Sequence, residues 1–277
     1  MSERLKAFVN EEVAKKKERW ISFRKHLHQY PELSFQEEKT QAFIAQQLDE
    51  MGIAYEKGGE DLRFLIAVLN PEEKKTIALR ADIDALPILE ENETEYASKN
   101  IGIMHACGHD VHTSCLLGAL DVLREMENSM PYRVVAVFQP AEEKLPGGAS
   151  LLLKKNILQS YQPRLIIGQH VHPPLQAGQL GFKAGPYMAS ADEIRFTVNG
   201  KGGHAATPHE CVDPVYISSL LIVQLQSLMS RLKNPIEPGV LSIGKINSDG
   251  GATNVIPQRV FIEGTLRCMN DDFRELA

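Results

Sequence analysis

The segment Thr76-Ile77-Ala78-Leu79-Arg80-Ala81-Asp82-Ile83-Asp84 decides the fold that this sequence predicts. Its first four residues are typical of a β-strand, and the chain then passes directly into two carboxylates. In open α/β sheets, binding sites gather at the carboxyl ends of the strands. We therefore interpret this segment as a strand that delivers Asp82 and Asp84 to one edge of a sheet.

The segments around this strand alternate between helical and strand patterns. Apolar residues at helical spacing and short apolar runs predict helices at residues 3–28, 111–126 and 148–157 and strands at residues 64–69, 133–138 and 164–168. A further helix is predicted between Ser34 and Gly52, because residues 34–37 have the pattern of a capping box and Gly52 stands where a C′ glycine belongs. This alternation predicts an α/β domain with a mainly parallel sheet.

The pattern changes near Pro186. A strand, a long helix and two more strands are expected at residues 194–198, 214–232, 241–246 and 260–266. We therefore predict a catalytic α/β domain over residues 1–186 and an α+β lid over residues 187–277. A helix start at Asn270 is followed by only about two turns before Ala277, so we expect the natural chain to continue beyond this point.

Composition limits the function classes. Hydrophobic residues make up 43% of the 277 residues and charged residues 24%, which excludes disordered and fibrous proteins. The net charge of −6 argues against a nucleic-acid partner, and no apolar run approaches the ~18 residues of a membrane span. Four scattered cysteines and a charged N-terminal segment without a signal-peptide core predict a cytoplasmic, reducing location.

The densest group of reactive side chains lies at residues 104–112, Met-His-Ala-Cys-Gly-His-Asp-Val-His. Thiolate and imidazole groups bind borderline and soft divalent metals. Any one of these side chains alone would be better interpreted as a buried small residue or a polar group at a helix start, but three histidines around Cys107 argue against that interpretation. A nucleophilic Cys107 remains an alternative, which requires an oriented base and an oxyanion hole.

Two further groups follow predicted strands. Glu142 and Glu143 come after the strand at residues 133–138, where adjacent side chains point in different directions, so that one can bind a metal while the other acts as a general base. The alternative is a solvated acidic pair at the start of a loop. His170 and His172 follow the strand at residues 164–168.

These groups converge on the same predicted sheet edge. The residues concerned are Asp82, Asp84, Cys107, His109, Glu142, Glu143 and His170. A mixed set of sulfur, nitrogen and oxygen ligands suits Zn, Mn, Co or Ni better than Mg or Ca.

Six ordered segments resemble motifs of the M20 metallopeptidase family, in its aminoacylase, hippurate hydrolase and auxin-conjugate amidohydrolase branch. They cover residues 24–33, 80–87, 104–112, 138–143 with 147–149, 202–206 and 254–257. The His-Ala-Cys-Gly-His element at residues 105–109 marks this branch, in which a cysteine replaces the aspartate of the wider family.

The resemblance implies a two-metal amidohydrolase whose inserted lid also mediates homodimerisation. The implied metal ligands are Cys107, His109, Glu143 and His170. Glu142 resembles the general base, and Asp84 matches a position that orients a ligand without binding metal itself. Family members continue past this length and supply a last histidine ligand near their end.

The resemblance also assigns three residues of the predicted lid. His204 matches a histidine that reaches the partner subunit's active site and stabilises the oxyanion, while Asn254 and Arg267 match positions that contact the substrate carboxylate. The implied activity is hydrolysis of the amide bond of N-acyl or N-aroyl amino acids. The alternatives are a dipeptidase of the same family and a non-catalytic metal-binding or dimerising fragment. A zinc deaminase is discouraged because no Pro-Cys-x-x-Cys motif follows.

Overall fold

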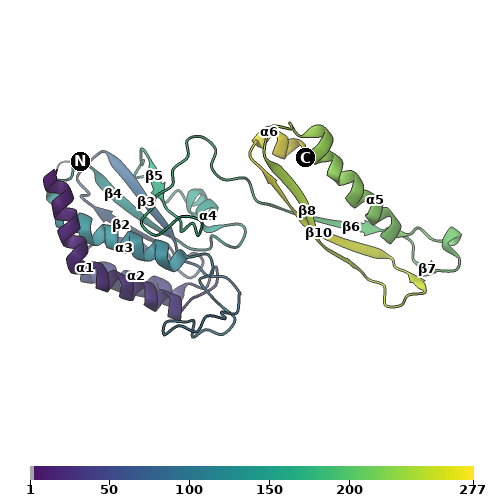
Figure 1. Ribbon diagram of the computed structural model, residues 1–277, viewed down its shortest axis with the longest axis horizontal. Coiled ribbons are helices and arrows are strands. Elements are labelled where there is room, and N and C mark those ends of the chain that lie inside the picture. The colour runs from purple at the N-terminus through teal and green to yellow at the C-terminus, as the bar shows by residue number, and fades with distance from the viewer. Residues whose placement is uncertain (1–2) are drawn as a thin grey trace. The chain divides into compact units, whose positions relative to one another are not determined.

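The computed structural model describes residues 3–277 and divides into two compact units, one up to Gln176 and the other from Ala177 to Ala277 (Figure 1). Residues 169–191, which the structure describes throughout, contain no helix or strand and connect the two units. The boundary expected from the sequence, between residues 186 and 187, falls within this connection. The roles of the two units as catalytic domain and lid remain predictions.

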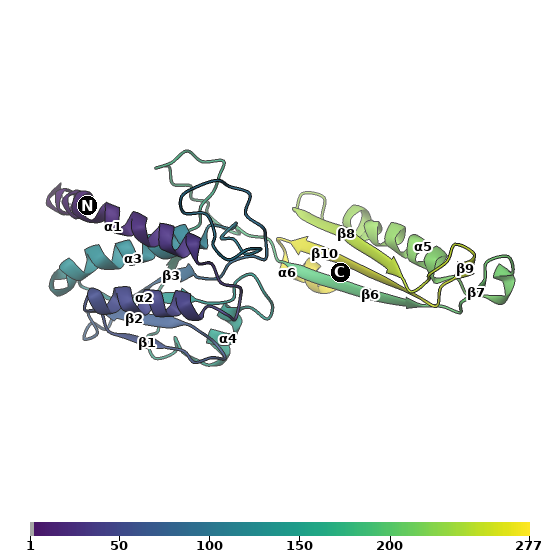
Figure 2. The same cartoon turned by 90° about the horizontal axis from the view of Figure 1, so that it is seen from below.

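The first unit is a five-stranded sheet with helices on both faces (Figure 2). Its helices are α1 (Glu3–Gln29), α2 (Glu38–Glu50), α3 (His109–Glu125), the short η1 (Glu127–Ser129) and α4 (Gly148–Lys154). Its strands are β1 (Tyr55–Lys57), β2 (Leu65–Leu69), β3 (Thr76–Asp82), β4 (Arg133–Gln139) and β5 (Ile166–Gly168), in the spatial order β1-β2-β4-β3-β5.

The sheet is mixed, which corrects the prediction of a mainly parallel sheet. Strands β3, β4 and β5 are parallel, as predicted, but β2 runs antiparallel to both β1 and β4. Only a loop joins β1 to β2, and a short loop cannot carry the chain back across the sheet as a parallel crossover does. The parallel half of the sheet is the half that holds the candidate site.

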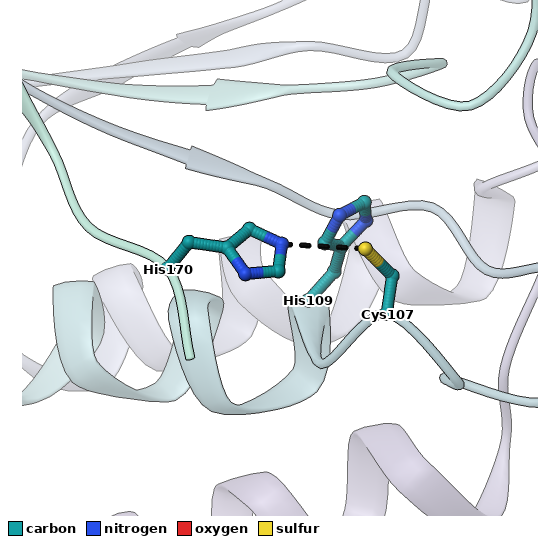
Figure 3. Close-up of side chains that lie close together, drawn as sticks. All are labelled: Cys107, His109 and His170. Atoms are coloured by element: carbon teal, nitrogen blue, oxygen red, sulfur yellow. Dashed lines mark hydrogen bonds between the residues drawn. The ribbon is translucent and has the colours of Figure 1, made fainter. Parts of the chain in front are cut away.

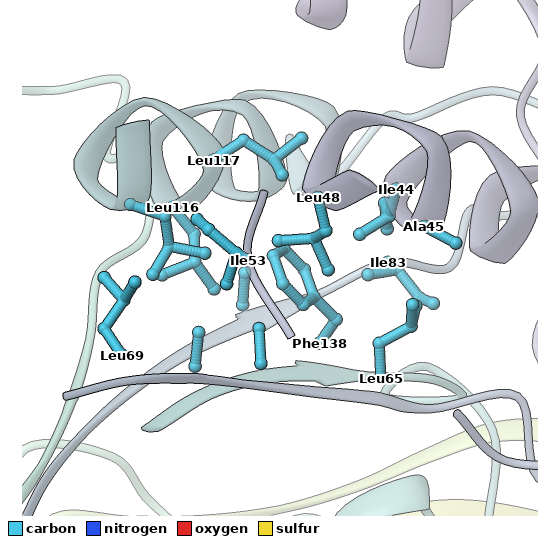
Figure 4. Close-up of a cluster of buried hydrophobic side chains, with 14 of the residues drawn as sticks. Ile44, Ala45, Leu48, Ile53, Leu65, Leu69, Ile83, Leu116, Leu117 and Phe138 are labelled. Carbon is cyan, nitrogen blue, oxygen red and sulfur yellow. The ribbon is translucent and has the colours of Figure 1, made fainter. Parts of the chain in front are cut away.

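The core forms because β2 and β4 alternate their side chains between the two faces of the sheet. On one face, strand residues such as Leu65 and Phe138 pack with Ile44 and Leu48 of α2 and Leu117 of α3 (Figure 4). On the other face, Ile66, Val135 and Val137 pack with Leu152 of α4. Each fully buried side chain of this size contributes about 1.5–3 kcal/mol from the removal of apolar surface from water.

The start of α2 differs from the predicted capping box. The helix begins after Glu37, which makes no side-chain capping bond. The carboxylate of Glu32 instead accepts hydrogen bonds from the backbone N–H groups of Lys39 and Thr40. The Ser34 hydroxyl donates to Asp84 at 2.6 Å, so this side chain belongs to the edge of the sheet and not to the helix.

The second unit is a three-stranded antiparallel sheet with the order β6-β10-β8 and helix α5 along one face (Figure 1). Its strands are β6 (Asp192–Asn199), β7 (Gly203–His204), β8 (Gly239–Ser248), β9 (Val255–Ile256) and β10 (Arg259–Cys268), and its helices are η2 (Pro208–Glu210), α5 (Pro214–Ser227), η3 (Leu228–Leu232) and α6 (Asp271–Leu276). The predicted order of strand, helix, strand and strand is observed, with β7 and β9 as an additional small sheet.

The helical segment Pro214–Leu232 is long and apolar enough, by length and composition, to cross a membrane. The expectation that no apolar run approaches this length therefore fails by these two criteria. The segment packs against the sheet of its own unit. Its residues Leu225, Leu228 and Met229 contact the buried side chains of Leu241 and Leu266. A membrane partner is not implied by length and composition alone.

Candidate metal centre

The parallel strands deliver their following residues to one edge of the sheet. Asp84 follows β3, Glu142 and Glu143 follow β4, and His170 follows β5, while His109 is the first residue of α3. The predicted convergence is observed, because the backbone N–H of Glu143 donates to Asp84 at 3.0 Å and His109 Nε2 lies 3.9 Å from Glu143 Oε1.

Cys107, His109 and His170 form the sulfur and nitrogen part of the site. Their candidate ligand atoms all lie within 4.8 Å of one another, and Cys107 Sγ is 3.3 Å from His170 Nε2 (Figure 3). His109 is buried, whereas His170 is exposed. This group is therefore open on one side, as a site that admits a substrate must be.

The outer nitrogens of both histidines are already occupied. Nδ1 of His109 donates to the backbone oxygen of Asp84 at 2.9 Å, and Nδ1 of His170 donates to the backbone oxygen of Val171 at 2.9 Å. A neutral imidazole with its proton on Nδ1 has an unprotonated Nε2. In its neutral form each ring therefore offers Nε2 to a metal, as is typical of metal-binding histidines.

Carboxylates form the oxygen part of the site. Asp82, His109 and Glu142 also have ligand atoms within 4.8 Å of one another. This grouping adds Asp82 and Glu142 to the implied ligand set. Oδ1 of Asp82 already accepts a hydrogen bond from His112, however, and its Oδ2 forms an ion pair with Arg80 at 2.6 Å. We therefore assign Asp82 to the support of the site and not to its ligands.

A divalent metal fits these residues. In the part of the chain that the structure describes, the buried atoms His109 Nε2, Glu143 Oε1 and Asp84 Oδ1 make no hydrogen bond. Buried polar atoms without partners are costly in an ordinary protein interior, about 1–3 kcal/mol each. Two of these atoms belong to implied ligands, and a cation between them would satisfy both.

The charges of the site shift the pKa values of its members. Burial alone would raise the pKa of Asp82, but the hydrogen bond from His112 and the charges of His109 and Arg80 outweigh burial and hold that pKa well below its usual value. Burial alone would lower the pKa of His109, but its interactions with Asp84, Cys107 and Asp82 raise it to about 11. Without a metal, these acidic groups therefore favour the protonated form of His109, and a bound cation would take the place of the proton on its Nε2.

The pKa of Glu142 is shifted in the opposite direction to that of Asp82. Partial burial, followed by the negative charges of Glu143 and Asp82, raises the pKa of Glu142. Among residues 3–277, no group donates a hydrogen bond to the Glu142 carboxylate. A carboxylate of raised basicity beside a metal centre is suited to accept and return a proton.

Gly108 permits the close approach of the chain segments that carry the ligands. Its φ of +93° is accessible to glycine without strain, and a Cβ at this position would lie 2.3 Å from Cγ2 of Val171. Cys107, His109 and His170 are neighbours of these two residues in sequence. A side chain at residue 108 would therefore separate the ligands.

Sequence reasoning missed the residues that support the site. Glu37 is completely buried and accepts a hydrogen bond from Ala141 N–H at 2.8 Å, and Ala141 has a positive φ of 50° immediately before Glu142. Burial, only partly offset by hydrogen bonds from backbone N–H groups, raises the pKa of Glu37 to about 7. The capping-box pattern included Ser34 and Glu37, but it predicted that they cap a helix, whereas they contact Asp84 and Ala141 at the site.

The predicted site residues of the second unit, His204, Asn254 and Arg267, do not all lie close together. His204 and Asn254 are neighbours, since Ala205 N–H donates to the backbone oxygen of Asn254 at 3.0 Å. Arg267 lies near the opposite end of β10 from Arg259, and at the usual rise per residue these eight positions span about 27 Å. Within one chain, Asn254 and Arg267 therefore cannot both contact one small carboxylate.

The histidine of this group has a defined tautomer as well. Nδ1 of His204 accepts a hydrogen bond from Ala206 N–H at 3.0 Å, so its proton is on Nε2. The side chain is exposed and presents an N–H donor, which is the chemistry required for binding a developing oxyanion.

Comparison with known proteins agrees with this geometry. The chain is 46% identical over 255 residues to an N-acetyl-L-cysteine deacetylase of Bacillus subtilis (92% of this chain, 60% of the relative) and 39% identical over 254 residues to an N-acyl-L-amino acid amidohydrolase of Geobacillus stearothermophilus (92% and 68%). The YXEP protein of Bacillus subtilis, described as a dinuclear metal binding peptidase from the M20 family, superposes with a TM-score of 0.75 at 35% identity over 98% of this chain and 67% of that one.

The chain thus spans 60% of the length of the first of these relatives. Residues 78–266 match the family described as Peptidase family M20/M25/M40, and this range contains every residue assigned to the metal centre above. The resemblance inferred from the six sequence motifs is confirmed. This chain belongs to peptidase family M20/M25/M40.

Proposed function

We propose that this protein is a metal-dependent amidohydrolase that cleaves the amide bond of N-acyl or N-aroyl amino acids. The observation that carries the proposal is the convergence of Cys107, His109 and His170 at one sheet edge, with Glu143 Oε1 3.9 Å from His109 Nε2 and Glu142 beside it. The relatives named as a deacetylase and an amidohydrolase support this activity over that of a dipeptidase.

The ligands assigned to the metals are Cys107, His109, Glu143 and His170. Zn, Mn, Co or Ni suits this mixed donor set, and a pair of such ions would supply the Lewis acidity that polarises an amide carbonyl and acidifies water. Two ions agree with the dinuclear centre named for the YXEP protein. Asp84 orients His109 and holds the backbone of Glu143 through its own hydrogen bonds.

Glu142 is the general base of the proposed reaction. Its carboxylate takes a proton from the attacking water and returns it to the nitrogen of the leaving amino acid, so the carboxylate is unchanged after one turnover. The raised pKa of Glu142 makes it a better proton acceptor than an ordinary exposed glutamate. General acid–base catalysis of this kind contributes about 10²–10⁴-fold to the rate.

The positions of His204, Asn254 and Arg267 support a homodimer. A small N-acyl amino acid cannot reach across the roughly 27 Å that separates the two ends of β10. If all three residues serve one substrate, they must come from two copies of the chain. We assign His204, with its neighbour Asn254, to the site of the partner subunit, so that Arg267 would serve that substrate from the other copy of the chain.

Location and metal identity remain part of the proposal. All four cysteines are free thiols, which supports a reducing compartment such as the cytoplasm. The alternative that the experiment below tests is a non-catalytic metal-binding protein. It would bind metal at the same residues but would not hydrolyse substrate.

The experiment that separates these functions compares the protein with its Glu142→Gln variant. Both are loaded with Mn or Zn and assayed against N-acetyl and N-benzoyl amino acids and against dipeptides. We expect hydrolysis of the acylated amino acids by the wild type and a loss of about 10²–10⁴-fold in the variant, with unchanged metal content. Metal binding without hydrolysis of any substrate would favour the non-catalytic alternative, and preference for dipeptides would favour a dipeptidase.

A further inference from the structure

His112 is a buried histidine of the 104–112 segment to which the proposed function gives no role. Only 2% of its surface is exposed, and it lies one turn along α3 from His109. Its ring centroid is 6.3 Å from that of His170. A histidine that is buried this completely must satisfy both of its ring nitrogens.

The two ring nitrogens of His112 connect the ends of two strands. Nδ1 donates to Oδ1 of Asp82, the last residue of β3, and Nε2 accepts a hydrogen bond from the backbone N–H of Gln169 at 3.3 Å. A neutral imidazole has one donor and one acceptor, so one tautomer satisfies both bonds. Asp82 selects this tautomer because a carboxylate accepts a hydrogen bond and cannot donate one.

Asp82 is itself firmly held. Its backbone oxygen accepts a hydrogen bond from the Thr113 hydroxyl at 2.8 Å, and its second carboxylate oxygen pairs with Arg80. Only 1% of its surface is exposed. The orientation of His112 is therefore fixed by the rigid, parallel part of the sheet.

The segment on the other side of His112 has much weaker support. Strand β5 has three residues, all exposed, and among the described strands it pairs only with β3 at the edge of the sheet. The chain after Gly168 has no helix or strand before Asp192 within the described residues. His170 lies in this stretch, directly after Gln169, so the bond from Gln169 N–H to His112 restrains the backbone next to a metal ligand.

We propose that His112, oriented by Asp82, is a positioning residue that fixes the Gln169 amide and thereby places the His170 imidazole beside Cys107 and His109. The inference rests on the proposed function for the assignment of His170 to the metal. It adds the group that holds this ligand in place, since among residues 3–277 the side chain of His170 is hydrogen-bonded only to the neighbouring Val171 oxygen and to Cys107.

The test is a double-mutant cycle on Zn²⁺ affinity, measured by competition with a chromophoric chelator. The variants are His112→Phe, His170→Ala and both together. Phenylalanine keeps the ring volume but removes both hydrogen bonds. Since loss of a group that orients a metal ligand typically costs about 10–100-fold in metal affinity, we expect a loss of that size for His112→Phe. In the His170→Ala background, we expect the same substitution to change affinity by less than about two-fold.

The matched control is Leu120→Ala. Leu120 is completely buried in the same helix, about 12 Å along the helix axis from His112, and belongs to the hydrophobic core. This variant loses core packing, but we expect it to bind Zn²⁺ as the wild type does. Equal losses for His112→Phe in both backgrounds, or the same loss for Leu120→Ala, would show that His112 acts on overall stability and would overturn the inference.

A second readout needs no metal. In the metal-free protein, we expect the amide of Gln169 to exchange its hydrogen faster in His112→Phe than in the wild type, while amides of β4 keep their protection. Unchanged exchange at Gln169 would overturn the inference. If the wild type bound no Zn²⁺, the proposed function would fail, and the exchange of this amide would still decide whether His112 holds Gln169.

Discussion

Asp84 accepts a hydrogen bond from the backbone N–H of Glu143 at 3.0 Å, and this bond ties the end of β3 to the segment that follows β4. The same carboxylate oxygen accepts from the Ser34 hydroxyl, and its other oxygen lies 3.3 Å from His109 Nδ1. One buried residue therefore contacts two assigned metal ligands: its carboxylate holds the backbone of Glu143, and its backbone oxygen accepts the hydrogen bond from His109 Nδ1. The arrangement agrees with the implied role of Asp84, which is to orient ligands without binding metal.

Substitution of Asp84 should weaken metal binding although Asp84 is not a ligand. We expect Asp84→Ala to lower Zn²⁺ affinity by about 10–100-fold, because Glu143 loses the hydrogen bond that orients its backbone and His109 loses the carboxylate oxygen 3.3 Å from its Nδ1. The matched control is Asp61→Ala, which removes an exposed carboxylate that pairs with Lys155. Competition titrations of both variants check the prediction, and wild-type affinity in Asp84→Ala would contradict it.

Gly108 offers a test of the close approach between the ligand-bearing segments. Gly108→Ala places a methyl group 2.3 Å from Cγ2 of Val171, closer than two carbon atoms can approach, and we expect a marked loss of Zn²⁺ affinity. Gly102→Ala is the control, because Gly102 has a similar positive φ of 81° but no neighbouring atom within 4 Å. It should lose some stability through backbone strain and keep its affinity. Partial recovery in Gly108→Ala with Val171→Ala would show that the clash is the cause.

His28 should make stability depend on pH. Its two ring nitrogens face Asp110 at 2.8 Å and Glu90 at 3.0 Å, so both need a proton to donate. The hydrogen bond with Asp110, supported by Glu90, outweighs burial and raises the pKa of His28. The stabilising contribution is then complete below the unfolded pKa of about 6.5 and is lost as the pH rises through the raised value.

The variant His28→Gln measures this contribution. We expect it to lower the free energy of unfolding by about 1–3 kcal/mol at acidic pH, and the difference from the wild type should shrink toward alkaline pH. Denaturant titrations with a metal chelator present, between about pH 6 and pH 9, check the trend. The exposed His209→Gln is the control. A difference that grows with pH would show that the sign is wrong.

Complementation tests whether His204 acts in the partner subunit. Glu142→Gln and His204→Asn should each be nearly inactive, but an equimolar mixture that exchanges subunits should recover about a quarter of wild-type activity. Half of the randomly mixed dimers are mixed, and each has one site with both residues intact. No recovery, with subunit exchange confirmed by mass spectrometry, would place His204 in the site of its own chain or outside the site.

Much of this architecture follows from local sequence patterns. The strand ends at residues 82, 139 and 168 lie within a few residues of the predicted ends, and parallel strands necessarily bring them to one edge. The direction of β2 was not predictable in the same way. A run of apolar residues indicates a strand but does not show whether its partner is parallel, and β1 is too short and exposed to give a clear signal.

The supporting hydrogen bonds were also beyond local patterns. Ser34 and Glu37 match a capping box, but their observed partners are Asp84 and Ala141, which lie far away in the sequence. The same holds for His112, which stands within the recognised histidine cluster and yet acts on Gln169 from another strand end. Residue types and spacing predicted the ligands, whereas the groups that orient them depend on the tertiary fold.

The most direct measurement for the central claim is the metal content per chain, determined by elemental mass spectrometry after separate supplementation with Zn and Mn. The account predicts about two ions per chain for the wild type, as in a dinuclear centre, and a clear reduction in Cys107→Ser and His109→Ala. A value near zero for the wild type, or unchanged values in both variants, would contradict the assignment of this sheet edge as the metal centre.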